Sequence, residues 1–145
     1  MNAHNTRRLM ARYPRLYGLA KLSPRHSNMC FGFECGDGWH DIIDRVSWWF
    51  TVLWKLFRVE VKATQVKEKL GGLRFYHYPQ FPCWMPRRLS RAFARFGWWL
   101  EDWALLESEH TCESCGRSGR HGHVGYWVET SCEACAREGF VPYER

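Results

Sequence analysis

Two Cys-x-x-Cys pairs near the C-terminus constrain the fold of this 145-residue chain more than any other feature. Cys112 and Cys115 form the first pair, Cys132 and Cys135 form the second, and sixteen residues separate the two pairs. Four thiolates with this spacing can surround one tetrahedral ion, which predicts a structural zinc site of the four-cysteine kind. Because four thiolates leave no position for water or substrate, the zinc is expected to support the fold and not to catalyse a reaction.

The sequence around these cysteines predicts a small zinc module over residues 110–145. Gly116 follows the first pair, as a tight turn at the metal requires, and residues 123–130 are long enough for a short hairpin. A helix starting at Cys132 would favour thiolates through its N-terminal dipole, and turn, hairpin and helix then follow the order of a treble clef. A zinc ribbon, with a second hairpin in place of the helix, is the alternative. Three histidines offer replacement ligands, although the cysteine set is complete without them: His110, His121 and His123.

The composition indicates a soluble protein with a substantial core. Hydrophobic residues make up 46% of the chain and aromatic residues 17%, which argues against disorder. The first 30 residues are rich in arginine and lack the apolar segment of a signal peptide, so the seven cysteines are expected in a reducing compartment. The most apolar run, residues 46–54, is far shorter than the roughly 20 residues of a membrane span. We therefore expect a cytoplasmic protein with no membrane contact.

Charge and hydrophobic pattern divide the chain into three parts. Residues 1–28 form a basic N-terminal arm, residues 29–109 an α+β core, and residues 110–145 the zinc module. The arm contains six arginines and lysines and no acidic residue, within a chain of net charge +6. We expect Leu16 and Tyr17 to anchor the arm over the core; a nucleic-acid-binding tail is the alternative.

A long apolar helix is predicted over residues 38–57. Asp37 is placed to cap its N-terminus, and Asp41 lies in its first turn, where an acid interacts favourably with the helix dipole. The apolar residues form one broad stripe: Ile42, Ile43, Val46, Trp49, Phe50, Leu53, Trp54 and Phe57. A helix with so much apolar surface is expected at the centre of the fold or under a partner.

The hydrophobic pattern then changes from helical to extended. Apolar and polar residues alternate over residues 59–64, and a second strand pattern covers residues 73–78. Gly71 and Gly72 between them indicate a hairpin, so we expect a small antiparallel sheet. A short helical turn over residues 65–70 is the alternative for the segment before the glycines.

A basic amphipathic helix is predicted over residues 86–109, with a core-facing stripe of Leu89, Phe93, Phe96, Leu100 and Trp103. Gly97 interrupts this helix at a cost of about 1 kcal/mol relative to Ala, which indicates that another element packs closely there. The arginines lie in the N-terminal half and the acids in the C-terminal half, an order that opposes the helix dipole. The arginines are Arg87, Arg88, Arg91 and Arg95, and the acids are Glu101, Asp102, Glu107 and Glu109.

Three of these arginines form what we call the arginine ridge, because Arg88, Arg91 and Arg95 are spaced by three and four residues and share one side of the helix. We expect this ridge to bind phosphate or an acidic partner; a solvated face with local ion pairs is the alternative. The predicted binding residues are Arg87, Arg88, Arg91 and Arg95 of the helix and Arg12 and Arg15 of the N-terminal arm.

Catalytic constellations are weak, and we expect a protein that is not an enzyme. Four side chains around a glycine-rich turn could hold a divalent ion for phosphodiester cleavage: Glu34, Asp37, His40 and Asp41. Helix capping accounts for the two aspartates without any chemistry. A cysteine nucleophile beside His40 lacks a supporting motif. Cys30, Cys35 and Cys83 are expected to be buried thiols and not, with His40, a second metal site.

Five segments carry a resemblance that extends over most of the chain: residues 12–16, 32–39, 65–76, 108–116 and 127–132. With these segments the chain resembles a family of small proteins common in phage and prophage genomes, a family without an assigned activity. The resemblance implies an accessory phage protein that acts inside a bacterium, and it transfers no catalytic residues.

Together these features predict a zinc-binding accessory protein that binds a host or defence-system protein, as inhibitor or adaptor, through a basic, aromatic-rich surface. Nucleic-acid binding by the same arginines, with tryptophan or tyrosine side chains stacking on bases, is the alternative. A metal-dependent nuclease is the second alternative.

Overall fold

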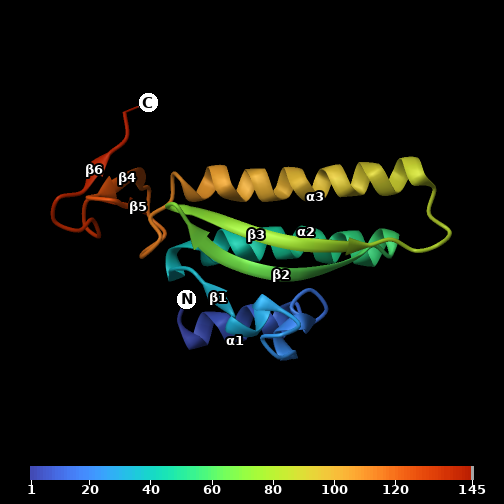
Figure 1. Ribbon diagram of the computed structural model, residues 1–145. Coiled ribbons are helices and arrows are strands. Elements are labelled where there is room, and N and C mark those ends of the chain that lie inside the picture. The colour runs from blue at the N-terminus through green and yellow to red at the C-terminus, as the bar shows by residue number, and fades with distance from the viewer. Residues whose placement is uncertain (145) are drawn as a thin grey trace.

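A long hairpin of two strands, β2 (Glu60–Lys69) and β3 (Gly72–Gln80), forms the centre of the computed structural model, which describes residues 1–144 (Figure 1). Leu70 and Gly71 connect the strands with positive φ angles of 54° and 72°, the conformation of a two-residue turn that follows the strand twist. The predicted hairpin is confirmed. Residues 65–69 continue β2 and do not form a helical turn.

The sheet is mixed and not purely antiparallel as predicted. A two-residue strand, β1 (Phe33–Glu34), pairs in parallel with β2, with Phe33 opposite Val66, and gives the strand order β1-β2-β3. β1 and β2 run parallel because helix α2 (His40–Phe57) crosses between them and returns the chain to the same direction. A strand of two residues shows no alternation, which is why the sequence did not reveal it.

Helix α2 supplies much of the core beside the sheet. The residues that it buries are Ile42, Ile43, Val46, Ser47, Phe50 and Leu53. Its packing on the hairpin includes a ring contact between Phe50 and Phe75 of β3, with centroids 5.9 Å apart. Of the eight residues in the predicted apolar stripe, five are buried, whereas Trp49 and Phe57 are 37% and 39% exposed.

The predicted role of Asp37 as a helix cap is wrong. A single turn of 3-10 helix, η3 (Asp37–Trp39), precedes α2, and α2 begins after Trp39 with no side-chain cap. The Asp37 carboxylate instead accepts hydrogen bonds from the backbone N–H of Asn2, at 2.9 Å, and from the side-chain amide of Asn5, at 3.0 Å. The backbone N–H of Asn2 lowers the pKa of Asp37, because it stabilises the charged form. Asp37 thus attaches the N-terminal segment to the core.

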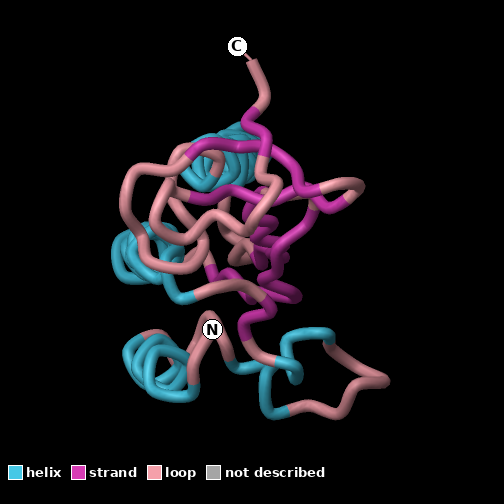
Figure 2. Tube along the Cα trace, turned by 90° about the vertical axis from the view of Figure 1, so that its left-hand side faces the viewer, coloured by secondary structure: helices cyan, strands magenta, loops and turns pink. Residues whose placement is uncertain are grey.

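The N-terminal segment is folded against the core. It begins with a helix, α1 (Ala3–Arg12), and continues through two 3-10 turns, η1 (Gly18–Lys21) and η2 (Asn28–Phe31). The expected anchors Leu16 and Tyr17 are both buried, and the Tyr17 hydroxyl lies 2.5 Å from the hydroxyl of Ser47 on α2. The arm is therefore a packed layer of the fold, on the β1 side of the sheet (Figures 1 and 2).

Helix α3 (Arg87–Ser108) lies along β3 and beside α2, at the top of Figure 1. Leu100 and Ala104 are buried on its inner side. Gly97 faces the ring of His77 on β3 so closely that an added Cβ would overlap the ring. The close approach expected from this glycine is confirmed.

Ring contacts hold α3 to α2 along their shared edge. Trp49 of α2 meets Phe96 of α3 at a centroid distance of 5.7 Å, and Phe57 meets Phe93 at 4.8 Å. Leu89, which the sequence placed in the core-facing stripe, is 39% exposed. It lies one turn beyond the Phe57–Phe93 contact, where α2 has ended.

A second small sheet lies at the end of the molecule where α3 ends (Figure 1). Its strands are β4 (Arg120–Val124), β5 (Trp127–Ser131) and β6 (Val141–Pro142), in the order β5-β4-β6. The helix predicted to start at Cys132 is absent from the described part of the module; a turn takes its place, and the chain returns as β6 beside β4. The described part of the module therefore lacks the helix that the predicted treble clef requires. Across residues 1–144, no helix combines the length and apolar character that a membrane crossing needs.

Candidate metal centre

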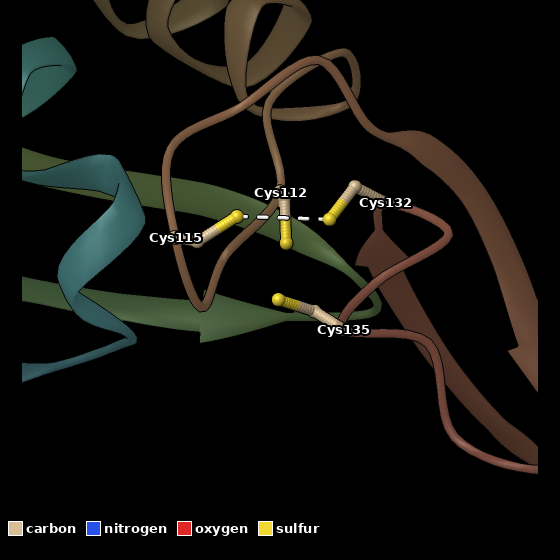
Figure 3. A group of neighbouring side chains, drawn as sticks. All are labelled: Cys112, Cys115, Cys132 and Cys135. Atoms are coloured by element: carbon tan, nitrogen blue, oxygen red, sulfur yellow. Dashed lines mark hydrogen bonds between the residues drawn. The ribbon is translucent and has the colours of Figure 1, made fainter.

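Four cysteine side chains converge where the second sheet meets the end of α3 (Figure 3). The sulfur atoms of Cys112, Cys115, Cys132 and Cys135 all lie within 4.8 Å of one another, and those of Cys115 and Cys132 are 3.6 Å apart. A tetrahedral zinc ion with Zn–S bonds of about 2.3 Å places its sulfur ligands about 3.8 Å apart. The four thiol groups are therefore arranged as a single metal ion requires.

Backbone hydrogen bonds shape the first cysteine turn. The N–H of Gly116 donates to the carbonyl of Cys112 at 2.9 Å, and the N–H of Cys112 donates to the carbonyl of Arg117 at 2.8 Å. Gly116 has a φ of +75°, which a side chain would strain. Cys112 is fully buried, Cys132 and Cys135 are half-buried and Cys115 is exposed, so the site lies at the protein surface.

The second cysteine turn is held in a similar way. The N–H groups of Cys135 and Ala136 both donate to the carbonyl of Cys132, at 3.1 and 2.8 Å. Arg137 then forms an ion pair with Glu129 of β5, which draws the chain back toward the sheet.

Hydrogen bonds among the cysteines shift the pKa values of Cys132 and Cys135 in opposite directions. Desolvation opposes the charge on Cys132, but hydrogen bonds from Cys115 and Cys135 lower its pKa to about 7. Hydrogen bonds with Cys115 and Cys132 raise the pKa of Cys135 to about 12, so the same network favours the thiolate, the form that ligates metals, at Cys132 and disfavours it at Cys135.

Glu113 connects the metal turn to the core. Its carbonyl accepts from the N–H of Gly38 at 2.7 Å, and its carboxylate accepts from the N–H of Gly36 at 2.8 Å. Burial raises the pKa of Glu113, while the hydrogen bond from Gly36 opposes that rise. Two further bonds cross the same boundary, because the Trp39 indole donates to the carbonyl of Thr111 and the Thr130 hydroxyl donates to that of Gly71. The cysteine site is therefore bound to the start of α2 and to the tip of the hairpin.

The histidines near the site have other contacts. His121 shares a hydrogen bond with the Thr130 hydroxyl at 3.0 Å, and His123 shares one with the carbonyl of Gly125 at 3.0 Å. Neither of them, nor His110, belongs to the cluster of ligand atoms, which consists of cysteines alone.

The structure does not assemble the second metal site or the nucleophile weighed from the sequence. Over the described residues, the four-cysteine group is the only one in which three or more candidate ligands come together. The prediction of three buried thiols holds for Cys35 alone and is wrong for Cys30, which is half-buried, and for Cys83, which is exposed. Burial raises the pKa of Cys35 to about 12. A thiol with so high a pKa remains protonated and is a poor nucleophile.

The acidic groups of the glycine-rich turn also point to separate partners. Glu34 accepts a hydrogen bond from the side chain of Gln65, and Asp37 accepts those of the N-terminal segment. Asp41 contacts the imidazole of His40 at 2.9 Å.

The predicted binding arginines fall into two groups on different sides of the molecule. Nη1 of Arg12 donates to both carboxylate oxygens of Asp44, and the guanidinium of Arg15 lies 4.4 Å from the ring centroid of Trp54. α1, which carries Arg12, lies near the β1 edge of the sheet, whereas α3 lies along β3 at the other edge (Figures 1 and 2). The structure therefore does not bring these two side chains together with those of α3.

The arginine ridge and Arg87 are exposed on the outer side of α3. Within residues 1–144, no ion pair involves any of these four arginines, so the local pairs of the alternative interpretation are not formed. Beside the ridge lie two tryptophans that sequence reasoning had not singled out: Trp98 is 60% exposed and Trp99 is 54% exposed. Their positions in the sequence could have revealed them, because Trp98 and Trp99 follow Arg95 by three and four residues and so lie next to it on the helix surface.

Fold and site together define a small α+β protein with a four-cysteine site suited to a metal ion. No protein-family model matches the chain, no curated protein is significantly similar to it, and no solved structure matches its fold.

Proposed function

We propose that this protein is a zinc-stabilised accessory protein that binds an acidic surface of another protein through the arginine ridge of α3. The observation that carries the proposal is the exposure of Arg88, Arg91 and Arg95 without an intramolecular acid, beside the exposed rings of Trp98 and Trp99. Arginine and tryptophan are the residues most enriched where binding energy concentrates in protein interfaces.

The role of the metal follows from the position of the cysteines. α3 ends at Ser108, and Cys112 lies four residues further on. A zinc ion held by four thiolates would fix the end of α3 against the core and so hold the ridge in one orientation. With four sulfur ligands the ion has no open position, so its role is structural.

The resemblance to phage proteins directs the proposal toward a partner inside a bacterium. A host protein or a component of a defence system is the class of partner we propose, with the chain acting as inhibitor or adaptor. The acids in the C-terminal half of α3 favour a protein partner over nucleic acid. A phosphate backbone that followed the whole helix would be repelled by Asp102 and Glu107, both of which are exposed.

Affinity capture from a bacterial lysate, with nuclease treatment, tests this proposal. The variant Arg88→Glu/Arg91→Glu/Arg95→Glu should weaken capture of the partner by at least about tenfold, since each site changes from attraction to repulsion. The matched control is Arg7→Glu/Arg8→Glu/Arg25→Glu, which makes the same charge change at exposed positions in the N-terminal segment. Undiminished capture by the ridge variant would contradict the proposal.

Nucleic-acid binding is the second candidate because Trp98 and Trp99 are exposed beside the arginines, and aromatic side chains can stack on bases. In that case capture would disappear after nuclease treatment, and binding to single-stranded DNA or RNA would weaken steeply with salt. Absence of binding to both at low salt would remove this candidate.

A further inference from the structure

The outer face of α3 has a charge pattern that nothing within the chain explains. Its N-terminal half carries Arg88, Arg91 and Arg95, and its C-terminal half carries Asp102, an order that opposes the helix dipole. All four side chains are exposed, and in the described part of the chain none of them takes part in an ion pair. The helix therefore bears an unfavourable charge order without any compensation from its own chain.

The pattern is symmetric about the pair of tryptophans. Arg95 lies three residues before Trp98, and Asp102 lies three residues after Trp99. Arg88 lies ten residues before Trp98, and Glu109, at the end of the helix, lies ten residues after Trp99. Positions 88, 91, 95, 98, 102 and 109 recur at intervals of three, four or seven residues, so they form one stripe along the helix.

From this symmetry we infer that α3 binds a second copy of this chain, with the two α3 helices antiparallel and a twofold axis passing between Trp98 and Trp99. In that orientation each Arg95 faces the Asp102 of the other copy, and each Arg88 faces the other Glu109. A twofold interface requires one surface to be complementary to itself, and this stripe meets the requirement in the antiparallel orientation alone. A parallel pairing would place arginine beside arginine.

The distribution of apolar surface supports the same interface. Its centre would hold Trp98 and Trp99, with Leu106, 59% exposed, further along the same side. The aromatic surface continues onto α2 through ring contacts from Trp99 to Phe96 and from Phe96 to Trp49. An apolar centre with charges at its rim is the usual anatomy of a protein interface.

The outer face of α3 is also accessible along its length. The helix has 22 residues, which corresponds to about 33 Å. No described element covers the side of α3 that faces away from β3 (Figure 1). A second helix can therefore lie against the stripe from end to end.

This inference goes beyond the proposed function, although both use the exposed arginines of α3. Arg95 takes part in both interactions, so an acidic partner would compete with the second copy for the ridge. The acidic half of one α3 would occupy the ridge of the other until the partner displaced it.

Sedimentation velocity of the purified, zinc-loaded chain over a wide range of concentration tests the inference. The wild-type chain should form a dimer that weakens as salt rises. Arg95→Glu should weaken dimerisation by at least about tenfold, because it places two like-charged pairs in each dimer. The double variant Arg95→Glu/Asp102→Arg restores opposite charges at both positions and should dimerise again. Arg7→Glu, the same charge change in α1, should dimerise like the wild type.

Two results would overturn the inference: a wild-type chain that remains monomeric at every concentration, or a double variant that dimerises no better than Arg95→Glu. Helix content and zinc content of each variant confirm that it is folded, as expected for changes at exposed positions. The outcome is separate from that of the proposed function. A monomeric wild type whose ridge variant fails to capture a partner would remove the dimer and keep the partner surface. A wild-type chain that dimerises, together with a ridge variant that still captures the partner, would keep the dimer and remove the partner surface.

Discussion

Gly38 shows how closely the core approaches the metal site. Its N–H donates to the carbonyl of Glu113, and a Cβ at this position would overlap the backbone of Cys112 and of Gly116. Both neighbours belong to the turn that positions two sulfur ligands, so neither can yield without moving a thiolate. The core can therefore contact the cysteine turn only because residue 38 is a glycine.

We predict that Gly38→Ala lowers the free energy of unfolding by at least about 2 kcal/mol, because the turn must shift to admit the methyl group. Gly18→Ala is the matched control, since a Cβ there meets only the end of the Lys62 side chain, at 3.8 Å. The control should stay within about 0.5 kcal/mol of the wild type. Urea denaturation of both variants measures the difference, and equal stability would argue against the close approach.

At the scale of single residues, the sequence predicts ligands better than it predicts tertiary contacts. The four cysteines could be recognised because the spacing within each pair is local. Asp37 was misinterpreted because its partner, Asn2, lies 35 positions away, and the residues around Asp37 do not indicate so distant a contact. The close fit of Gly38 was missed for the same reason, since it depends on residues of a different element.

Helix α3 approaches strand β3 closely at Gly97, which has no side chain to keep them apart. The ring of His77 fills that position and is itself held by Glu101, one turn further along α3, at 2.6 Å. The ring also packs against Phe50 of α2, at a centroid distance of 4.7 Å. His77 therefore joins the two helices and the sheet.

Gly97→Ala should destabilise the protein by about 1–3 kcal/mol, although alanine favours an isolated helix by about 1 kcal/mol. The reason is that the methyl group would displace the His77 ring from its contacts with Glu101 and Phe50. Ala92→Gly, at an exposed position of the same helix, is the control and should cost about 1 kcal/mol. Thermal unfolding measures both. A stabilised Gly97→Ala protein would mean that the ring has room to move.

At the scale of elements, periodic segments were predicted well and short ones were not. The hairpin and α3 show clear repeats over enough residues to identify them. β1 is too short for a repeat, and α1 was missed because its pattern is weak. The helix expected at Cys132 was wrong: the chain turns there, and Arg137 pairs with Glu129 of β5, a contact between separate segments that local propensity does not contain.

For the molecule as a whole, the proposed zinc ion should be the largest single contribution to the stability of residues 110–144. Purified protein should contain one zinc per chain, and a chelator should lower the melting temperature by about 10 °C or more. Cys115→Ser should have the same effect, since the exposed Cys115 contributes little to packing apart from its ligand role. Cys83→Ser, which removes an exposed thiol outside the cluster, should retain the metal. Metal analysis measures the zinc content and calorimetry measures the melting temperature. A protein that loses its metal without a change in melting temperature would contradict the proposed zinc site.

The bond between the Thr130 hydroxyl and the carbonyl of Gly71 has a consequence for the order in which the molecule opens. The turn of a hairpin is usually free to open, but here the turn at Gly71 is hydrogen-bonded to the second sheet, which carries the cysteine site. The other end of the hairpin leads into a loop in which Cys83 and Trp84 are exposed. Amide protons should therefore exchange with solvent first near that loop and last beside the cysteines. Removal of the metal would reverse this order of amide exchange, so that the hairpin would open first at the turn around Gly71.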